Sequence, residues 1–199
     1  DVMRPFLHKS FMSIQECSIV QQYVNLLVLN KRIKKISQEN GEFWQLNGDP
    51  LTDSIGLVYQ ETVIAHIKKK VNLSYSMLRR WNAGASMPWH RNRWEAEWTV
   101  LIQISDNNWP IGFTGGQQES PYIEGQQSSS MILTPSRGDA VIFNASENFH
   151  SRHKLKGSEC TTLCLYYTEV DGYLDCKDNR DNYGDNYKTK QLAEVKYGK

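Results

Sequence analysis

The stretch MPWHRNRWEAEWTVLIQIS, from Met87 to Ser105, decides the fold that the sequence predicts. It opens with His90 in a short polar segment and continues into a long apolar run. Between Glu97 and Ile104 apolar and other residues alternate, which is the pattern of a β-strand with one buried face. That face would carry Trp98, Val100, Ile102 and Ile104. A histidine placed just before such a strand looks like the first half of a metal site.

The composition indicates one domain of ordinary size. The chain has 199 residues, with 23 Lys and Arg against 22 Asp and Glu. A net charge this close to zero argues against a dedicated nucleic-acid binder. No run of eighteen apolar residues exists, so we expect no transmembrane helix, and residues 1–11 lack the apolar run of a signal peptide. We predict a cytoplasmic protein without nucleic-acid or membrane partners, and the oligomeric state stays open.

The four cysteines form no CxxC zinc pattern. Cys160 and Cys164 lie four residues apart in a strand-like segment, roughly 13 Å if that segment is extended. This separation is too large for a disulfide without a bend. We therefore expect reduced thiols, although an even number of cysteines also permits pairing.

Residues 10–70 are predicted to be mainly helical. Ser13 and Glu16 form a capping box, and apolar residues then recur at helical spacing until the basic residues 31–35. Residues 41–51 are expected to be a loop because Gly48, Asp49 and Pro50 give a turn signal. A second helix is predicted from about residue 52 to residue 70.

From Leu73 onward the period changes to that of strands. Helices followed by many short strands predict an α+β fold in which antiparallel strands form a sandwich or barrel. We expect a single domain over residues 1–170, with a β-barrel core at 73–169. The polar residues 171–199 would be a disordered tail, a loose cover or a partner arm. The expected strands lie at 73–81, at 97–104, around Gly115 and Gly116, twice within 131–145, and at 159–170.

Three residues have the spacing of a metal site. His90 and Asn92 are two apart, so in an extended segment both side chains point to the same face. His150 follows another predicted strand some sixty residues later. Two histidines and a carboxylate on one face of an iron ion leave three positions open, which is the arrangement that binds an oxo acid and dioxygen. The position where this arrangement needs the carboxylate holds Asn92.

Five sequence fragments, in their order along the chain, resemble those of the iron(II)/2-oxoglutarate-dependent dioxygenases. The fold of that superfamily is the double-stranded β-helix, a jelly-roll or cupin-like barrel. The prolyl-hydroxylase-like branch of that superfamily is the most similar in style. The resemblance spans Leu73 to Tyr167, about half of the chain, and the preceding helices fit because helices commonly buttress this fold. The fragments are LRRWNAGASMPWHRN, EWTVLIQIS, FTGG, SRGDAVIFNASENFHSR and LKGSECTTLCLYY.

The resemblance implies that His90, Asn92 and His150 are the metal positions, with iron(II) and 2-oxoglutarate as cofactors. It also places Cys160 where the family has the arginine that pairs with the far carboxylate of 2-oxoglutarate. A neutral amide is a weaker ligand than a carboxylate, and a cysteine cannot replace a bidentate cationic clamp. Candidates to hold the oxo acid instead are Arg80, Arg152, Arg79, Lys154 and Lys156, of which Arg79 and Arg80 cannot both face the interior. Candidates for the missing acid are Glu95 and Glu97, if a bulge turns one toward the metal.

Three functional hypotheses follow. The first is a non-haem iron(II)/2-oxoglutarate-dependent oxygenase that hydroxylates a small molecule or a peptide. The second is a catalytically degenerate barrel whose mouth binds a small molecule or a protein, which the paired changes at Asn92 and Cys160 favour. The third is an unrelated jelly-roll or cupin-type protein that uses a metal without 2-oxoglutarate. The sequence names no substrate.

Overall fold

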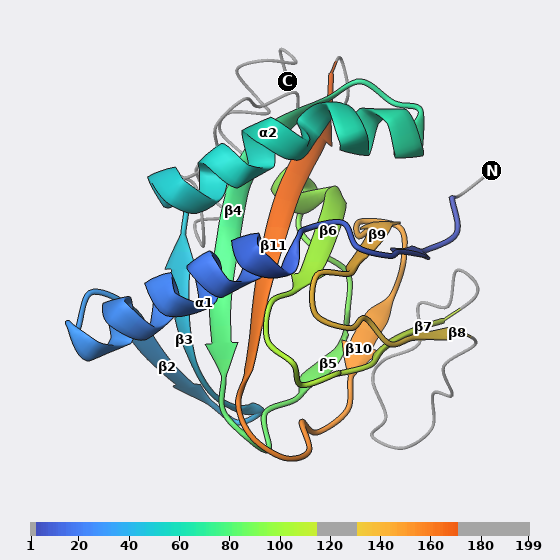
Figure 1. Ribbon diagram of the computed structural model, residues 1–199. Coiled ribbons are helices and arrows are strands. Elements are labelled where there is room, and N and C mark those ends of the chain that lie inside the picture. Colours follow the sequence, from blue (N-terminus) through green and yellow to red (C-terminus); the bar gives the residue numbers. More distant parts are fainter. Residues whose placement is uncertain (1–2, 115–130, 171–199) are drawn as a thin grey trace, which may run out of the picture.

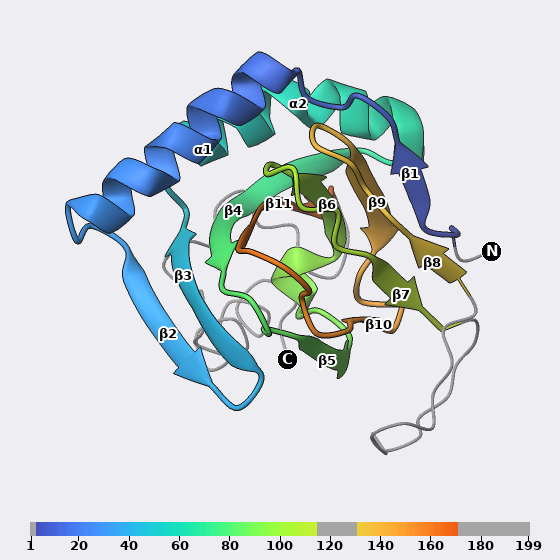
Figure 2. The same ribbon diagram turned by 60° about the horizontal axis from the view of Figure 1, so that its bottom comes forward.

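The computed structural model describes residues 3–114 and 131–170, in which two antiparallel sheets face each other. Helices Ile14–Leu29 (α1) and Pro50–Ile67 (α2) lie together on the outer side of the larger sheet (Figures 1 and 2). This arrangement confirms the predicted α+β class and the helices that buttress the major sheet.

The larger sheet has seven strands and the smaller one has four. The order in the larger sheet is β1-β9-β6-β11-β4-β3-β2, and the order in the smaller sheet is β5-β10-β7-β8. The strands of the larger sheet are β1 (Phe6–His8), β9 (Ala140–Asn144), β6 (Trp98–Gln103), β11 (Cys160–Glu169), β4 (Val71–Trp81), β3 (Gly41–Asn47) and β2 (Lys34–Gln38). Those of the smaller sheet are β5 (Met87–His90), β10 (His150–Arg152), β7 (Ile111–Phe113) and β8 (Met131–Leu133). One turn of 3-10 helix, η1 (Trp94–Ala96), joins β5 to β6.

The alternation in β6 separates two apolar cores. Val100 and Ile102 pack in the core beneath the helices, together with Val24 of α1 and Val63 of α2. Leu101 points the other way, into a second core between the two sheets. The predicted face of Trp98, Val100, Ile102 and Ile104 is therefore confirmed as the side that α1 and α2 cover.

The N-terminal region departs from the prediction between the two helices. The capping box of Ser13 and Glu16 begins α1 as expected, but the helix ends at Leu29, before the basic residues. Residues 34–38 and 41–47 instead form a hairpin, β2 and β3, so the predicted loop at 41–51 is wrong. The hairpin exists because β3 pairs with β4, which brings Phe43 against Trp81 at a ring separation of 4.7 Å. Neither contact is visible in a local pattern.

Two further expectations can be compared with the described residues. Cys17, Cys160 and Cys164 are free thiols, whereas Cys176 lies outside those residues, as do Gly115, Gly116 and the tail at 171–199. No helix in the described ranges is long and apolar enough to cross a membrane.

Candidate metal and oxo-acid site

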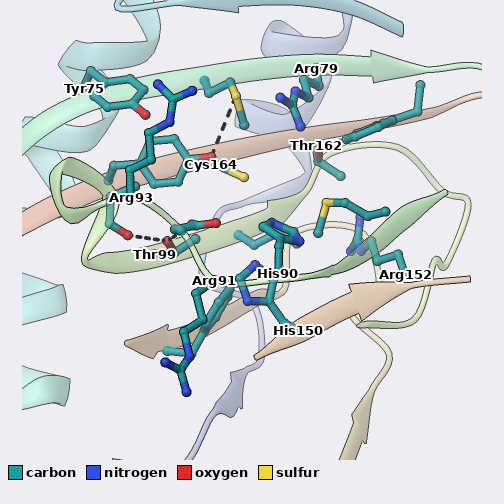
Figure 3. Close-up of a pocket in the computed structure, with 18 residues that line it drawn as sticks. Tyr75, Arg79, His90, Arg91, Arg93, Thr99, His150, Arg152, Thr162 and Cys164 are labelled. Carbon is teal, nitrogen blue, oxygen red and sulfur yellow. Dashed lines mark hydrogen bonds between the residues drawn. The ribbon is translucent and has the colours of Figure 1, made fainter. Parts of the chain in front are cut away.

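His90 and His150 meet at the facing ends of two strands of the smaller sheet. They are direct partners in the register of β5 and β10, and their ring centroids are 4.3 Å apart. His150 is 2% exposed and His90 is partly exposed. Both imidazoles line one cavity between the sheets, where Figure 3 draws them side by side. The structure thus brings together the two histidines that the sequence paired.

Backbone carbonyls fix the tautomer of both rings. Nδ1 of His90 is 2.8 Å from the carbonyl oxygen of Pro88, and Nδ1 of His150 is 2.9 Å from that of Asn148. A carbonyl oxygen only accepts, so in each neutral ring Nδ1 carries the proton and Nε2 keeps its lone pair. This is the orientation in which a histidine ligates a metal through Nε2.

Both imidazoles are neutral at physiological pH. Burial lowers the pKa of His90, and the nearby guanidinium of Arg79 lowers it further. Burial lowers the pKa of His150 to about 3, with His90 and Arg152 adding to the effect. The Nε2 atoms of the two imidazoles can therefore act as metal ligands through their lone pairs.

Asn92 lies in the same cavity with its amide held in one orientation. The hydroxyl of Thr99 donates to the carbonyl of Ala96 at 3.2 Å, so its oxygen accepts from Nδ2 of Asn92 at 3.0 Å. The amide oxygen is left as an acceptor, and a hydrogen bond with the Asn92 side chain acts to raise the pKa of His90. The donor set is thus two imidazoles and one neutral amide oxygen.

Neither glutamate replaces the missing acid. Glu95 is buried within η1 and Glu97 accepts the backbone N–H of Glu169 at 3.0 Å, and neither lines the cavity. Within residues 3–114 and 131–170, no three His, Cys, Asp or Glu side chains come close enough together to hold a metal ion.

Arg152 is the cation buried beside the histidines. It is 2% exposed, and its guanidinium lies over Trp109 at 4.5 Å from the ring centroid. Its Nε and Nη2 atoms are buried and have no hydrogen-bond partner among the described residues. Burial lowers the pKa of Arg152 to about 10, opposed by the thiols of Cys160 and Cys164, so the group remains a cation at neutral pH. Two unpartnered donors on a buried cation fit an anionic ligand.

The other candidate residues for the oxo acid lie elsewhere. Arg80 points away from the cavity, where its Nε and Nη2 each donate to the carboxylate of Glu159 at 2.7 Å. Cys160 is fully buried and accepts from Nε2 of Gln103 at 3.2 Å, also outside the cavity lining. Lys154 and Lys156 are exposed. Of the adjacent pair on β4, Arg79 is the residue that faces the cavity.

The cavity has a volume of about 230 Å³ and a mixed wall. Aromatic rings of Tyr75, Trp81, Phe143 and Tyr166 form part of it. Sequence reasoning missed Arg91 and Arg93, which also line it. Their position on either side of Asn92 was the available signal.

No family model matches the chain, and no curated protein matches it. The chain is similar in fold to several solved structures. The non-heme alpha ketoglutarate dependent epimerase SnoN from nogalamycin biosynthesis is 9% identical with a TM-score of 0.63, over 83% of this chain and 78% of that one. HygX from Streptomyces hygroscopicus, with nickel, 2-oxoglutarate and hygromycin B bound, is 10% identical with a TM-score of 0.60, over 83% of each chain. A prolyl-4-hydroxylase from Pseudomonas putida is 10% identical with a TM-score of 0.61, over 83% of this chain and 92% of that one.

At these identities the similarity establishes the fold. The chain has the double-stranded β-helix fold of the iron(II)/2-oxoglutarate-dependent oxygenases, as the sequence resemblance implied.

Proposed function

We propose that this chain is an iron(II)/2-oxoglutarate-dependent oxygenase with an altered site. His90 and His150 would hold the metal through Nε2, the amide oxygen of Asn92 would be a neutral third ligand, and Arg152 would bind the far carboxylate of 2-oxoglutarate. The observation that carries the proposal is the pair of correctly oriented imidazoles beside a buried cation with two free donors. Solved structures of the same fold hold nickel or Fe3+ together with this oxo acid.

The arginine would act from a different strand than the family pattern implies. In that pattern the cation stands at position 160 on β11, whereas here it stands on β10, two residues after His150. Cys160 packs in the same apolar cluster as Trp109, and the guanidinium of Arg152 lies over Trp109, so the guanidinium lies near position 160. Cys160 would be permissive because a small residue leaves room for Arg152.

When bound, iron(II) and 2-oxoglutarate would supply the activation of dioxygen and the two-electron oxidation of a substrate. The residues of the chain would do the rest. Arg152 would fix the oxo acid by a charge-assisted contact, and Trp109 would hold the plane of its guanidinium. The aromatic wall of Tyr75, Phe143 and Tyr166 would keep water from the reacting carbon.

A second function has one observation in its favour. Among the residues that the structure describes, none gives the site a carboxylate, so these residues leave it one negative charge short for a divalent ion. A degenerate member that uses the cavity only to bind a small molecule would show this loss. Such a protein would bind an organic anion at Arg152 without requiring a metal.

Spectroscopy separates the two functions. Anaerobic addition of iron(II) and 2-oxoglutarate should give the visible charge-transfer absorbance of an oxo acid on iron, and His150→Gln and Arg152→Gln should each abolish it. His153→Gln is the matched control, since His153 is an exposed histidine of the same segment. Absence of the band at saturating concentrations of both cofactors would rule out the oxygenase and leave the binding module.

A further inference from the structure

Strands β4 and β11 present a ladder of paired side chains to the cavity. Their register sets Arg79 opposite Thr162, Met77 opposite Cys164 and Tyr75 opposite Tyr166. All of these residues line the cavity, as expected for every second residue of a strand. Among them, Arg79 alone is charged, so the ladder has one cationic end and one aromatic end.

The guanidinium of Arg79 is held by its neighbours. Its Nε donates to Oε1 of Gln45, the register partner of Arg79 on β3, at 2.6 Å. Its central carbon lies 4.7 Å from the ring centroid of Phe43 and 4.9 Å from that of Trp81. Because an amide and two rings already restrict this side chain, it loses little conformational freedom when it binds a ligand.

Arg79 and Thr162 both keep hydrogen-bond donors for a ligand. Within residues 3–114 and 131–170, no ion pair and no hydrogen bond engages Nη1 or Nη2 of Arg79. The hydroxyl of Thr162 accepts from Nε1 of Trp81 at 3.1 Å, and no described residue accepts the hydrogen of that hydroxyl. A guanidinium and a hydroxyl with unused donors, side by side in the register, favour an anion.

Arg79 is a separate cation from the one assigned to the oxo acid. It lies on β4 of the larger sheet, whereas Arg152 lies on β10 of the smaller sheet (Figure 3). In the proposed function, Arg152 and the metal take the two carboxylates of 2-oxoglutarate. No Asp or Glu of the described residues lines the cavity, so the charge of Arg79 is left for a ligand to balance.

Beyond Arg79 the ladder becomes apolar and then aromatic. Met77 and Cys164 form the next pair, followed by Tyr75 and Tyr166, whose ring centroids are 4.8 Å apart. Successive pairs lie roughly 7 Å apart along the strands, since each is two residues further on. A small ligand anchored at Arg79 would therefore place its body on Met77 and its far end near the two tyrosine rings.

We propose that the substrate is a small carboxylic acid with an apolar or aromatic body, and that Arg79 and Thr162 bind its carboxylate. The inference rests on the proposed function, because that function assigns Arg152 to 2-oxoglutarate. A carboxylate fits better than a phosphate, since one guanidinium balances one negative charge and its planar fork matches two carboxylate oxygens. The body of the acid would lie between the ladder and the two imidazoles, which line the same cavity from the smaller sheet.

Titration calorimetry with matched probes tests this site. Benzoate carries a carboxylate on an aromatic body, and benzamide is its neutral counterpart. Each is added to the full chain saturated with nickel(II) and 2-oxoglutarate, so that the metal site and Arg152 are occupied. Benzoate should bind about tenfold more tightly than benzamide or better, as expected for a charge-assisted contact. Equal affinities for the two probes, or tighter binding of phenyl phosphate than of benzoate, would overturn the proposal.

Variants of the ladder locate the carboxylate. Arg79→Gln should raise the Kd of benzoate about tenfold or more, and Thr162→Val about threefold, with the Kd of benzamide unchanged. Arg79→Lys keeps the charge without the planar fork, so it should bind benzoate with intermediate affinity, and it replaces Arg79→Gln if that variant does not fold. Arg80→Gln is the matched control, since Arg80 lies on the other face of β4 and pairs with Glu159. If benzoate binds the Arg79 variants as it binds the wild type, its carboxylate lies elsewhere and the proposal fails.

A second arm separates this proposal from the proposed function. Benzoate is titrated into the metal-free full chain carrying Arg152→Gln, with and without Arg79→Gln. Binding that depends on Arg79 there supports the carboxylate site even if iron(II) and 2-oxoglutarate fail to bind the wild-type chain, which would count against the oxygenase alone. If Arg79→Gln weakens 2-oxoglutarate binding as strongly as Arg152→Gln does and leaves benzoate binding unchanged, Arg79 belongs to the oxo acid and the substrate assignment is refuted.

Discussion

His150 lies directly opposite His90 in the pairing of β10 with β5, and the ring centroids of the two histidines are 4.3 Å apart. Because successive side chains of a strand face opposite ways, a slip of one residue in this register would turn one imidazole out of the cavity. The candidate metal site therefore depends on the register of two short strands that are sixty residues apart in the sequence.

Replacement of either histidine should remove the metal. We expect His90→Gln and His150→Gln each to weaken nickel(II) binding by more than about a hundredfold, since even residues that only orient metal ligands cost up to that much. Titration calorimetry with nickel(II) checks this result, and His153→Gln should bind as the wild type does. Equal affinity in all three variants would mean that the imidazoles serve packing alone.

Asn92→Asp should strengthen metal binding. A carboxylate at this position returns the missing negative charge within a few ångströms of the ion, and at such distances one charge pair is worth about 1 kcal/mol in water and more in a partly buried site. We expect the Kd for nickel(II) to fall about tenfold or more. Asn25→Asp is the control, because Asn25 already accepts a hydrogen bond from Gln21 on α1. An unchanged Kd would place residue 92 outside the coordination sphere.

An arginine at position 160 on β11 should be able to replace Arg152 on β10 in binding 2-oxoglutarate. Arg152→Gln should weaken 2-oxoglutarate binding about a hundredfold, and adding Cys160→Arg should recover part of that loss, since Cys160 packs in the same cluster as Trp109, which the Arg152 guanidinium covers. Cys160→Arg alone should destabilise the fold by about 1–3 kcal/mol because Cys160 is fully buried and a larger side chain would overpack its surroundings. Binding and urea unfolding measure the two effects. Failure of the double variant to recover any affinity would disprove the swap.

Metal and oxo acid should bind cooperatively. Arg79 and Arg152 act on the two imidazoles, so a divalent ion enters a site that is already positive. The dianion 2-oxoglutarate relieves this repulsion, and by linkage each ligand must strengthen the other by the same factor. We expect that factor to be about ten or more for nickel(II) measured with and without 2-oxoglutarate, and to shrink in Asn92→Asp. Independent binding of the two ligands would contradict this account of the charge.

Gly56 marks a close approach between α2 and the larger sheet. A Cβ at this position would lie 2.6 Å from Cδ1 of Leu73, and the carbonyl of Gly56 accepts the hydroxyl of Tyr167 at 2.8 Å. Gly56→Ala should therefore lower the free energy of unfolding by about 1–2 kcal/mol, although alanine is the better helix former. Urea unfolding checks the value against Ser54→Ala on the exposed face of the same helix. A stabilised Gly56→Ala would show that the interface has room to spare.

The sequence predicted the strands that carry a strong apolar alternation and missed those that depend on pairing. The face of Val100 and Ile102 was readable because its period is local. The β2–β3 hairpin was not, since β2 is largely exposed and β3 is held through its contact with β4. Position in the sheet, not intrinsic preference, made residues 41–47 a strand.

The same division applies to the candidate site. His90, Asn92 and His150 could be proposed from spacing, whereas the choice between Arg80 and Arg79 depended on which side of β4 faces the interior. Arg152 could be named as one of several basic residues, but nothing in the sequence showed that it is buried with two donors free.

By itself the sequence determined the class of fold and which residues are candidate metal ligands, because periodicity and motif order are properties of the chain. Only the tertiary structure decided which cations surround the imidazoles and which carboxylates stay away from them. The charge and burial at one point depend on side chains from several strands. The distances between those side chains are set only when the two sheets pack face to face.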